Sequence, residues 1–139
     1  MSAFVIDASV AIKWLVNEPG TSQAVRLRQH SLSAPDLLVS ECANIIWKKA
    51  RLRELTPREA ALAAGLITRS DVQLIPGRQL APRAVELAIA LDHSACDCMY
   101  LALAELMVRP FVTADARLLR KLATGGAGVT AIDLSAFTG

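Results

Sequence analysis

The chain has 139 residues, of which 53% are hydrophobic and 20% are charged, and its formal net charge at pH 7 is +2. This length and apolar content suffice for one folded domain with a hydrophobic core, and they exclude an intrinsically disordered chain. The weakly basic balance permits contact with nucleic acid but does not by itself indicate it.

Strands and helices are expected to alternate along the chain. In chain order we predict a strand at 4–6, helices at 8–16 and 21–29, a strand at 32–34, helices at 37–55 and 57–69, a strand at 72–75, helices at 82–91 and from Ser94 or Asp97 to 107, a strand at 110–113, a helix at 115–122 and a strand at 129–134. This order predicts an α/β fold, a single domain over 1–139 with a mostly parallel central sheet of about five strands and helices on both faces.

Local signals set several of these boundaries. Thr56 and Glu59 flank Pro57 in the pattern of a capping box, and Thr21 and Asp36 are expected to be helix N-caps. The glycine-rich segment 125–128 is expected to be a loop before the last strand.

Neither a membrane-spanning segment nor an export signal is predicted. The apolar runs are short; the one from Cys98 to Ala104, for example, ends at Glu105. The first residues lack the basic segment of a signal peptide. The odd number of cysteines, without zinc-like spacing, is typical of thiols in a reducing compartment. We therefore expect a cytoplasmic protein without membrane contact.

Four acidic residues lie where strands end or helices begin. Asp7 and Asp115 follow strands, whereas Glu41 and Asp97 fall near the starts of helices. Because ligands of open parallel sheets bind at the carboxyl ends of the strands, we expect all four at one edge of the sheet. Each alone could be a helix cap or complement the helix dipole.

Four carboxylates without a basic neighbour would repel one another, and a divalent cation removes that cost. Oxygen ligands of this kind suit Mg²⁺ or Mn²⁺, which can activate water for phosphodiester hydrolysis.

The same acids lie in segments that resemble those of PIN-domain nucleases, and more narrowly of VapC-type toxins of bacterial toxin–antitoxin pairs. The segments are Phe4–Ser9, Ala34–Leu37 leading to Glu41 and Asn44, Asp97–Ala104 and Val112–Asp115. The resemblance implies a PIN-like fold and a Mg²⁺- or Mn²⁺-dependent endoribonuclease. It also implies that Asp7, Glu41, Asp97 and Asp115 are the catalytic and metal-binding tetrad.

Neighbouring polar residues are expected to support this tetrad. Ser9 and Thr113 match polar positions beside it and could orient a carboxylate, although helix capping or loop hydrogen bonding would explain each equally well. Asn44, one helical turn after Glu41, could fix the Glu41 carboxylate. His93 is expected at the surface or in a loop, with a role beside Asp97 left open.

Basic residues are candidates for contact with the RNA backbone. Arg117 follows Asp115 by two residues and is the stronger candidate, whereas Lys48 and Arg51 could equally form a solvated helix face. The resemblance further implies a cognate antitoxin and a homodimer as partners. The apolar helices between residues 8 and 69 would offer surface for them.

Two other readings compete with the nuclease. A phosphoryl-transfer domain of the dehalogenase type would need a second Asp two residues after Asp7, where the chain has Ser9. A catalytically silent PIN-like module that binds RNA or protein remains the alternative function.

Overall fold

Five parallel strands form one sheet in the computed structural model, which describes residues 2–125 and 128–139. They are β1 (Ala3–Ile6), β2 (Ser31–Pro35), β3 (Gln73–Ile75), β4 (Phe111–Thr113) and β5 (Ala131–Asp133), in the order β3-β2-β1-β4-β5. Each neighbouring pair is parallel. The α/β fold with a parallel sheet that the sequence predicts is therefore confirmed.

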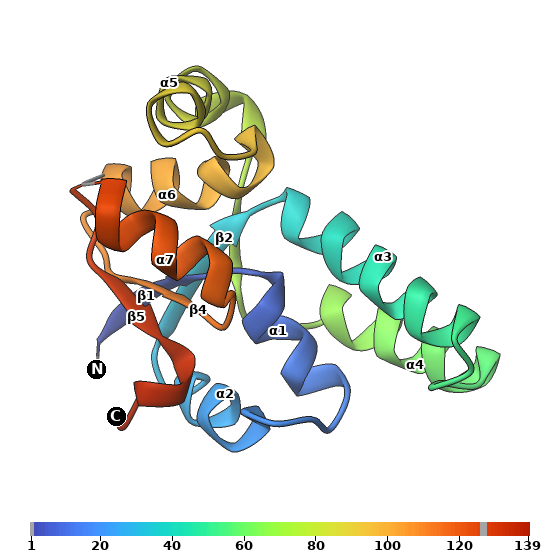
Figure 1. The fold of residues 1–139 in the computed structure, drawn as a ribbon. Coiled ribbons are helices and arrows are strands. Elements are labelled where there is room, and N and C mark those ends of the chain that lie inside the picture. Colours follow the sequence, from blue (N-terminus) through green and yellow to red (C-terminus); the bar gives the residue numbers. More distant parts are fainter. Residues whose placement is uncertain (1, 126–127) are drawn as a thin grey trace.

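Helices cover both faces of this sheet. They are α1 (Ala8–Leu15), α2 (Thr21–Leu27), α3 (Leu37–Arg51), α4 (Pro57–Thr68), α5 (Ala81–Leu91), α6 (Ala95–Met107) and α7 (Ala116–Gly125), with short 3-10 turns at Gly77–Gln79 and Leu134–Ala136. Figure 1 shows α5, α6 and α7 on one side of the sheet and α1 and α2 on the other. The α3 and α4 pair extends beyond the sheet, and α3 points away from it.

The strand order reverses at β1. The chain first adds β2 and β3 on one side of β1, and later adds β4 and β5 on its other side. Such a reversal opens a crevice at the carboxyl ends of the strands, where ligands bind in open α/β sheets. Because Ile6 pairs with Val112 in the β1–β4 ladder, Asp7 and Thr113 come next to each other at this crevice.

The core is built from the sheet and from α6, the most buried helix. Ile6, Tyr100, Leu101, Leu103 and Phe111 are among the largest fully buried side chains. Burial of each such side chain contributes on the order of 2 kcal/mol to stability. This packing holds the strand ends and the first turn of α6 in fixed relation.

Three local expectations differ from the structure. Thr21 is the first residue of α2 rather than its cap, which is Gly20 in a left-handed conformation (φ 94°). Asp36 occupies the N-cap position of α3 as expected, but its side chain makes no capping bond; its Oδ1 instead accepts a hydrogen bond from the Gly77 amide at 3.2 Å. Gly125, expected in a loop, belongs to α7, and residues 126 and 127 of that expected loop lie outside the described part.

No single helix in the described ranges has the length and apolar content to cross a membrane. Within the same ranges, α5 and α6 reach that length and composition when they are taken together, but they are bent by 113° at the turn between them. Both helices contribute residues to the hydrophobic core.

Candidate functional site

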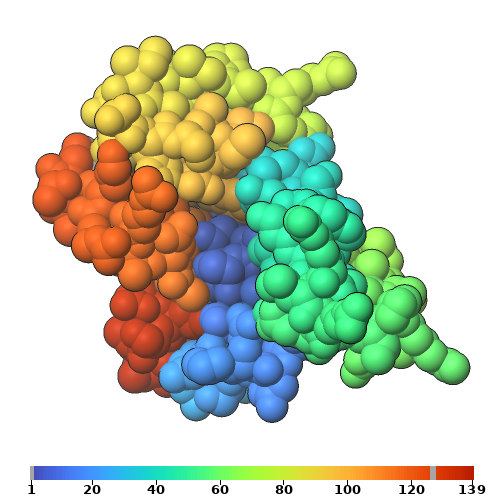
Figure 2. Space-filling view, turned by 45° about the vertical axis from the view of Figure 1, so that its right-hand side comes forward, coloured from blue at the N-terminus to red at the C-terminus, as the bar shows by residue number. Residues whose placement is uncertain are grey.

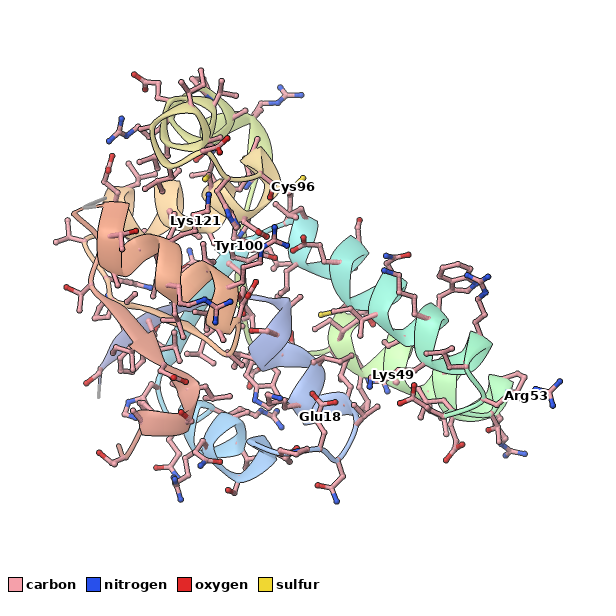
Figure 3. The ribbon with its side chains drawn as sticks, viewed as in Figure 1. Glu18, Lys49, Arg53, Cys96, Tyr100 and Lys121 are labelled. Atoms are coloured by element: carbon pink, nitrogen blue, oxygen red, sulfur yellow. The ribbon has the colours of Figure 1, made fainter. Side chains whose placement is uncertain are left out.

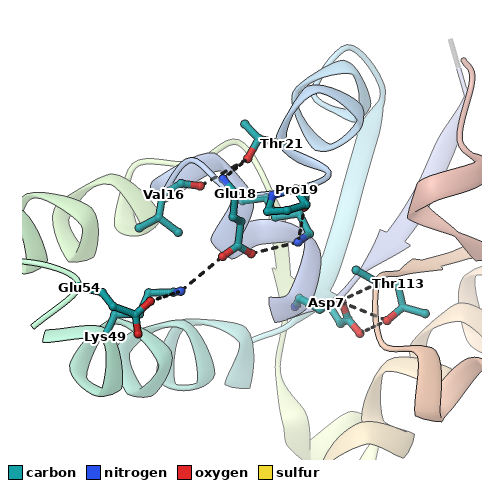
Figure 4. Close-up of polar contacts among 11 residues, drawn as sticks. Asp7, Val16, Glu18, Pro19, Thr21, Lys49, Glu54 and Thr113 are labelled. Carbon is teal, nitrogen blue, oxygen red and sulfur yellow. Dashed lines mark hydrogen bonds and ion pairs between the residues drawn. The ribbon is translucent and has the colours of Figure 1, made fainter. Parts of the chain in front are cut away.

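Asp7 is a buried carboxylate at the carboxyl end of β1. Only 8% of the residue is exposed. Its Oδ1 accepts a hydrogen bond from the Ser9 hydroxyl at 2.5 Å, and its Oδ2 accepts one from the Thr113 hydroxyl at 2.6 Å. Figure 4 shows Asp7 and Thr113 facing each other. The same carboxylate caps α1 by accepting from the Ser9 amide at 3.1 Å.

The two hydroxyls link Asp7 to the loop that carries Asp115. The Ser9 Oγ accepts from the Ala114 amide at 2.9 Å, and the Thr113 Oγ1 accepts from the Asp115 amide at 3.0 Å. Each hydroxyl proton is thus directed toward Asp7. Ser9 and Thr113 therefore hold one carboxylate in place from two separate segments of the chain.

Asp115 directly precedes α7 and caps it. Its Oδ1 accepts hydrogen bonds from the amides of Arg117 and Leu118, at 3.0 and 3.2 Å. Burial is the main cause of the raised pKa of Asp7, and the negative charge of the nearby Asp115 adds to it. Asp7 and Asp115 thus form one pair of neighbouring carboxylates.

Glu41 and Asp97 form a second pair, between α3 and α6. The charge of Asp97 contributes to a raised pKa of Glu41, although burial is the larger cause. The Tyr100 hydroxyl, one helical turn after Asp97, donates to Glu41 Oε1 at 2.5 Å. Figure 3 shows Tyr100 on the side of α6 that faces α3. Asn44 was expected to fix the Glu41 carboxylate. In the described residues the hydrogen bond to this carboxylate comes from Tyr100, and Asn44 is exposed.

Asp97 also contacts His93, which precedes α6. The His93 Nε2 lies 2.7 Å from Asp97 Oδ2, and only 10% of the His93 side chain is exposed. Ser94 caps this helix by accepting from the Asp97 amide at 3.3 Å. His93 therefore lies in a loop, as expected, and the role beside Asp97 that the sequence left open is that of a partly enclosed partner.

The two pairs surround one recess. Figure 2 shows a hollow whose floor is the beginning of the chain and whose walls are α3, α6 and α7. Tyr100 connects the pairs electrostatically, because both Glu41 and Asp7 raise its pKa, after burial as the main cause. Within 2–125 and 128–139, however, no three His, Cys, Asp or Glu side chains already converge on a common metal position.

The charge balance of the recess favours a cation. Burial raises the pKa of Asp7 to about 6, despite the hydroxyl hydrogen bonds that oppose the shift. In the described residues neither Asp7, Glu41 nor Asp115 forms an ion pair with a basic side chain. Carboxylate oxygens are the donors that hard divalent ions prefer. The four acids therefore fit Mg²⁺ or Mn²⁺ by the chemistry of their oxygen donors.

The three basic candidates differ in whether they line a hollow together with one of the acids. Arg117 lines a hollow of about 470 Å³ together with Asp97. Lys48 and Arg51 are exposed on the later turns of α3, and the Arg51 guanidinium lies over the Trp47 ring, 5.6 Å from its centroid. The arrangement thus favours Arg117 over the other two.

Sequence reasoning missed Tyr100 and did not assign His93. Tyr100 lies three residues after Asp97, on the same helix face, and this spacing could have indicated it. His93 lies four residues before Asp97, but on the other side of a helix start, where periodicity gives no guidance.

Comparisons with known proteins agree with this geometry. The family model for the PIN domain matches residues 4–124. Ribonuclease VapC12 of Mycobacterium tuberculosis is 31% identical over 115 residues, which cover 82% of this chain and 88% of that protein.

Solved structures share the fold. PAE2754 from Pyrobaculum aerophilum superimposes with a TM-score of 0.71 at 23% identity, covering 96% of this chain and 85% of that one. VapBC2 from Rickettsia felis, bound to a DNA fragment from its promoter, gives a TM-score of 0.65 at 11% identity, with 94% and 98% covered. VapC20 of Mycobacterium tuberculosis, a sarcin–ricin loop cleaving toxin, gives 0.61 at 16% identity, with 80% and 87% covered.

Proposed function

The chain belongs to the PIN-domain family, and from this premise we propose that it is a divalent-metal-dependent endoribonuclease, the toxin of a toxin–antitoxin pair. The ribonuclease and toxin parts draw on the VapC relatives. The metal dependence draws on the site, where none of the four carboxylates pairs with a lysine or arginine among the described residues and their oxygens fit a hard cation. Asp7, Glu41, Asp97 and Asp115 are the residues proposed to hold it.

One observation carries the proposal: the strand order brings two acid pairs from four distant segments to one recess. A domain that used its fold only for binding would gain nothing from this arrangement, because burial, with a smaller contribution from the neighbouring acid, raises the pKa of Asp7 and Glu41 at a cost to stability. When bound, a divalent ion would lower the pKa of a water and offset charge on the phosphodiester.

The residues of the chain have distinct parts in this reaction. Ser9 and Thr113 hold the Asp7 carboxylate by both oxygens. Tyr100 orients Glu41, and His93 holds one oxygen of Asp97. Asp115 is fixed by the first turn of α7. These bonds limit side-chain rotation, so that little reorganisation is needed when metal and RNA bind.

An antitoxin and a second copy of the chain are the proposed protein partners. Solved toxin–antitoxin complexes, such as that from Klebsiella pneumoniae, share the fold at a TM-score of 0.56. The chain itself leaves Trp47, Leu52, Leu62 and Leu66 exposed on α3, α4 and the segment between them. Large apolar side chains gathered in this way are typical of covered surfaces. The cytoplasm is the proposed location, since RNA is the substrate.

Cleavage of RNA tests the function. We expect the wild type to cleave single-stranded RNA in Mg²⁺ or Mn²⁺ and to be inactive in EDTA. Asp7→Asn should lower the rate by at least about a hundredfold, since one buried charge that holds the ion is lost. Asp71→Asn, an exposed acid on the segment before β3, is the matched control and should remain active.

Cleavage that persists in EDTA or in Asp7→Asn would exclude the metal-dependent nuclease. RNA binding without cleavage under all these conditions would instead favour the silent binding module.

A further inference from the structure

The hollow on the α7 side of the recess has features of a site of its own. It has a volume of about 470 Å³ and is lined by Asp92, His93, Ser94, Asp97, Arg117 and Lys121. This volume falls in the range of small-ligand sites, roughly 300–1,000 Å³. Asp97 belongs to both the hollow and the acid pairs, so a group bound here would lie beside the proposed centre.

Lys121 has a structural part in this hollow. Its ammonium donates to the backbone carbonyls of Asp92 and Leu91, at 2.6 and 3.3 Å. Those carbonyls end α5, where Asp92 adopts the left-handed conformation (φ 51°). Lys121 thus ties α7 to the turn that carries His93 and fixes the distance across the hollow. Figure 3 labels Lys121 on α7.

Several cations of the described residues are already engaged within the protein, and Arg117 is not among them. Elsewhere in the described residues, Lys13 and Lys49 pair with Glu18, Arg83 pairs with Glu105, Arg109 donates to Ser33, and Arg28 and Arg51 lie over tryptophan rings. Figure 4 shows the first of these networks, centred on Glu18. The Arg117 guanidinium has no ion pair or hydrogen-bond partner among the described residues, although two carboxylates line the same hollow.

A polyanion that approaches the four acids meets repulsion, so a cation beside them is needed to hold it. Guanidinium binds phosphate oxygens with two parallel hydrogen bonds, and its charge persists at any working pH. Among the residues that line the hollow, Arg117 alone offers a cation that is not already engaged with the protein.

We propose that this hollow binds a backbone phosphate of the RNA substrate next to the phosphate that is cleaved, with Arg117 as the ligand and Lys121 as the residue that holds the walls. This inference rests on the proposed function, since it names how the same site engages its substrate. In this proposal Arg117 contributes to RNA affinity and the four acids contribute to RNA cleavage, so binding and cleavage can be tested separately.

Binding of RNA without cleavage tests the inference. The parent protein is the Asp7→Asn variant in Mg²⁺, and the probe is a labelled mixed-sequence single-stranded RNA, followed by fluorescence anisotropy over a series of KCl concentrations. Arg117→Gln should weaken binding roughly fivefold at about 0.1 M salt, and should make the slope of log K against log salt shallower by about 0.7, as expected for one lost phosphate contact. Arg117→Lys should retain the slope and part of the affinity.

Arg120→Gln is the matched control, because Arg120 is exposed on the same helix and does not line the hollow. It should change neither affinity nor slope. The inference is overturned if Arg117→Gln keeps the parent slope, if Arg120→Gln reproduces its effect, or if the parent binds no RNA.

If any of these results is obtained while the wild type still cleaves RNA, the proposed phosphate site is excluded but the proposed nuclease function is not. If the wild type also fails to cleave RNA, both proposals are excluded.

Discussion

The Asp7 carboxylate is buried, and burial makes its ionised form less stable than it would be in water. Its pKa is raised from 3.8 to about 6, mainly by burial. The folded chain therefore holds this proton more tightly than the unfolded chain does. As pH rises between about 4 and 6, the unfolded state loses its proton first, so the free energy of unfolding must fall over that window and level off above it.

We expect this fall to reach up to about 3 kcal/mol in EDTA, since one unit of pKa corresponds to about 1.4 kcal/mol. Urea unfolding across this pH range measures it. Asp7→Asn should lack this part of the pH dependence, whereas Asp71→Asn should retain it. Parallel curves for the wild type and Asp7→Asn would show that the buried carboxylate is not the source.

Tyr100 should affect activity more than stability. Tyr100→Phe keeps the buried ring but removes the donor to Glu41. We expect a loss of roughly tenfold in kcat for RNA cleavage, which corresponds to about one hydrogen bond, with a nearly unchanged midpoint of urea unfolding.

A double variant with Glu41→Gln separates the roles. If Tyr100 acts through Glu41, adding Tyr100→Phe to Glu41→Gln should cost little more. Fully multiplicative losses would indicate that Tyr100 acts independently.

At the scale of single elements, stability and catalysis can be separated in α4. Thr56 and Glu59 form the capping box predicted from the sequence, with reciprocal bonds of 3.1 and 2.8 Å. Thr56→Ala should lower the free energy of unfolding by about 1 kcal/mol, because two amides at the helix start lose their arrangement. RNA cleavage at a temperature where the variant is folded should equal that of the wild type. A matching loss of cleavage would link α4 to the site.

The elements that were predictable are those with local causes. The capping box at Thr56 and the apolar run before Asp7 are set by neighbouring residues, so the sequence indicates them. Asp36 is of a residue type favoured at helix N-caps, but its carboxylate accepts a hydrogen bond from the Gly77 amide, which is distant in sequence. The Tyr100–Glu41 bond joins residues 59 apart, and only the packing of α6 against α3 determines it.

At the scale of the whole molecule, the sheet order decides how the four acids meet. The alternation of strands and helices correctly indicated an α/β fold, but not which strands are neighbours. With β1 between β2 and β4, Asp7 faces Asp115, while α3 and α6 bring Glu41 toward Asp97. The sequence predicted that the four acids share one edge of the sheet, and in the structure they form two pairs around one recess.

The exposed apolar surface of α3 and α4 predicts self-association. Trp47 and Leu62 are 53% and 62% exposed, which is costly for a monomer. Light scattering after size-exclusion chromatography should give a mass near twice the 14.9 kDa of one chain. A mass of one chain at every concentration tested would contradict the homodimer proposal.

Titration with Mn²⁺, followed by electron paramagnetic resonance, shows whether these carboxylates hold a divalent cation, because free and bound Mn²⁺ give different signals. We predict saturable binding by the wild type and by Asp71→Asn, and affinity at least about tenfold weaker in Asp7→Asn, as loss of a direct carboxylate ligand implies. Equal affinity in the wild type and Asp7→Asn would show that Asp7 is not a metal ligand, and no binding by the wild type would show that these carboxylates hold no divalent cation.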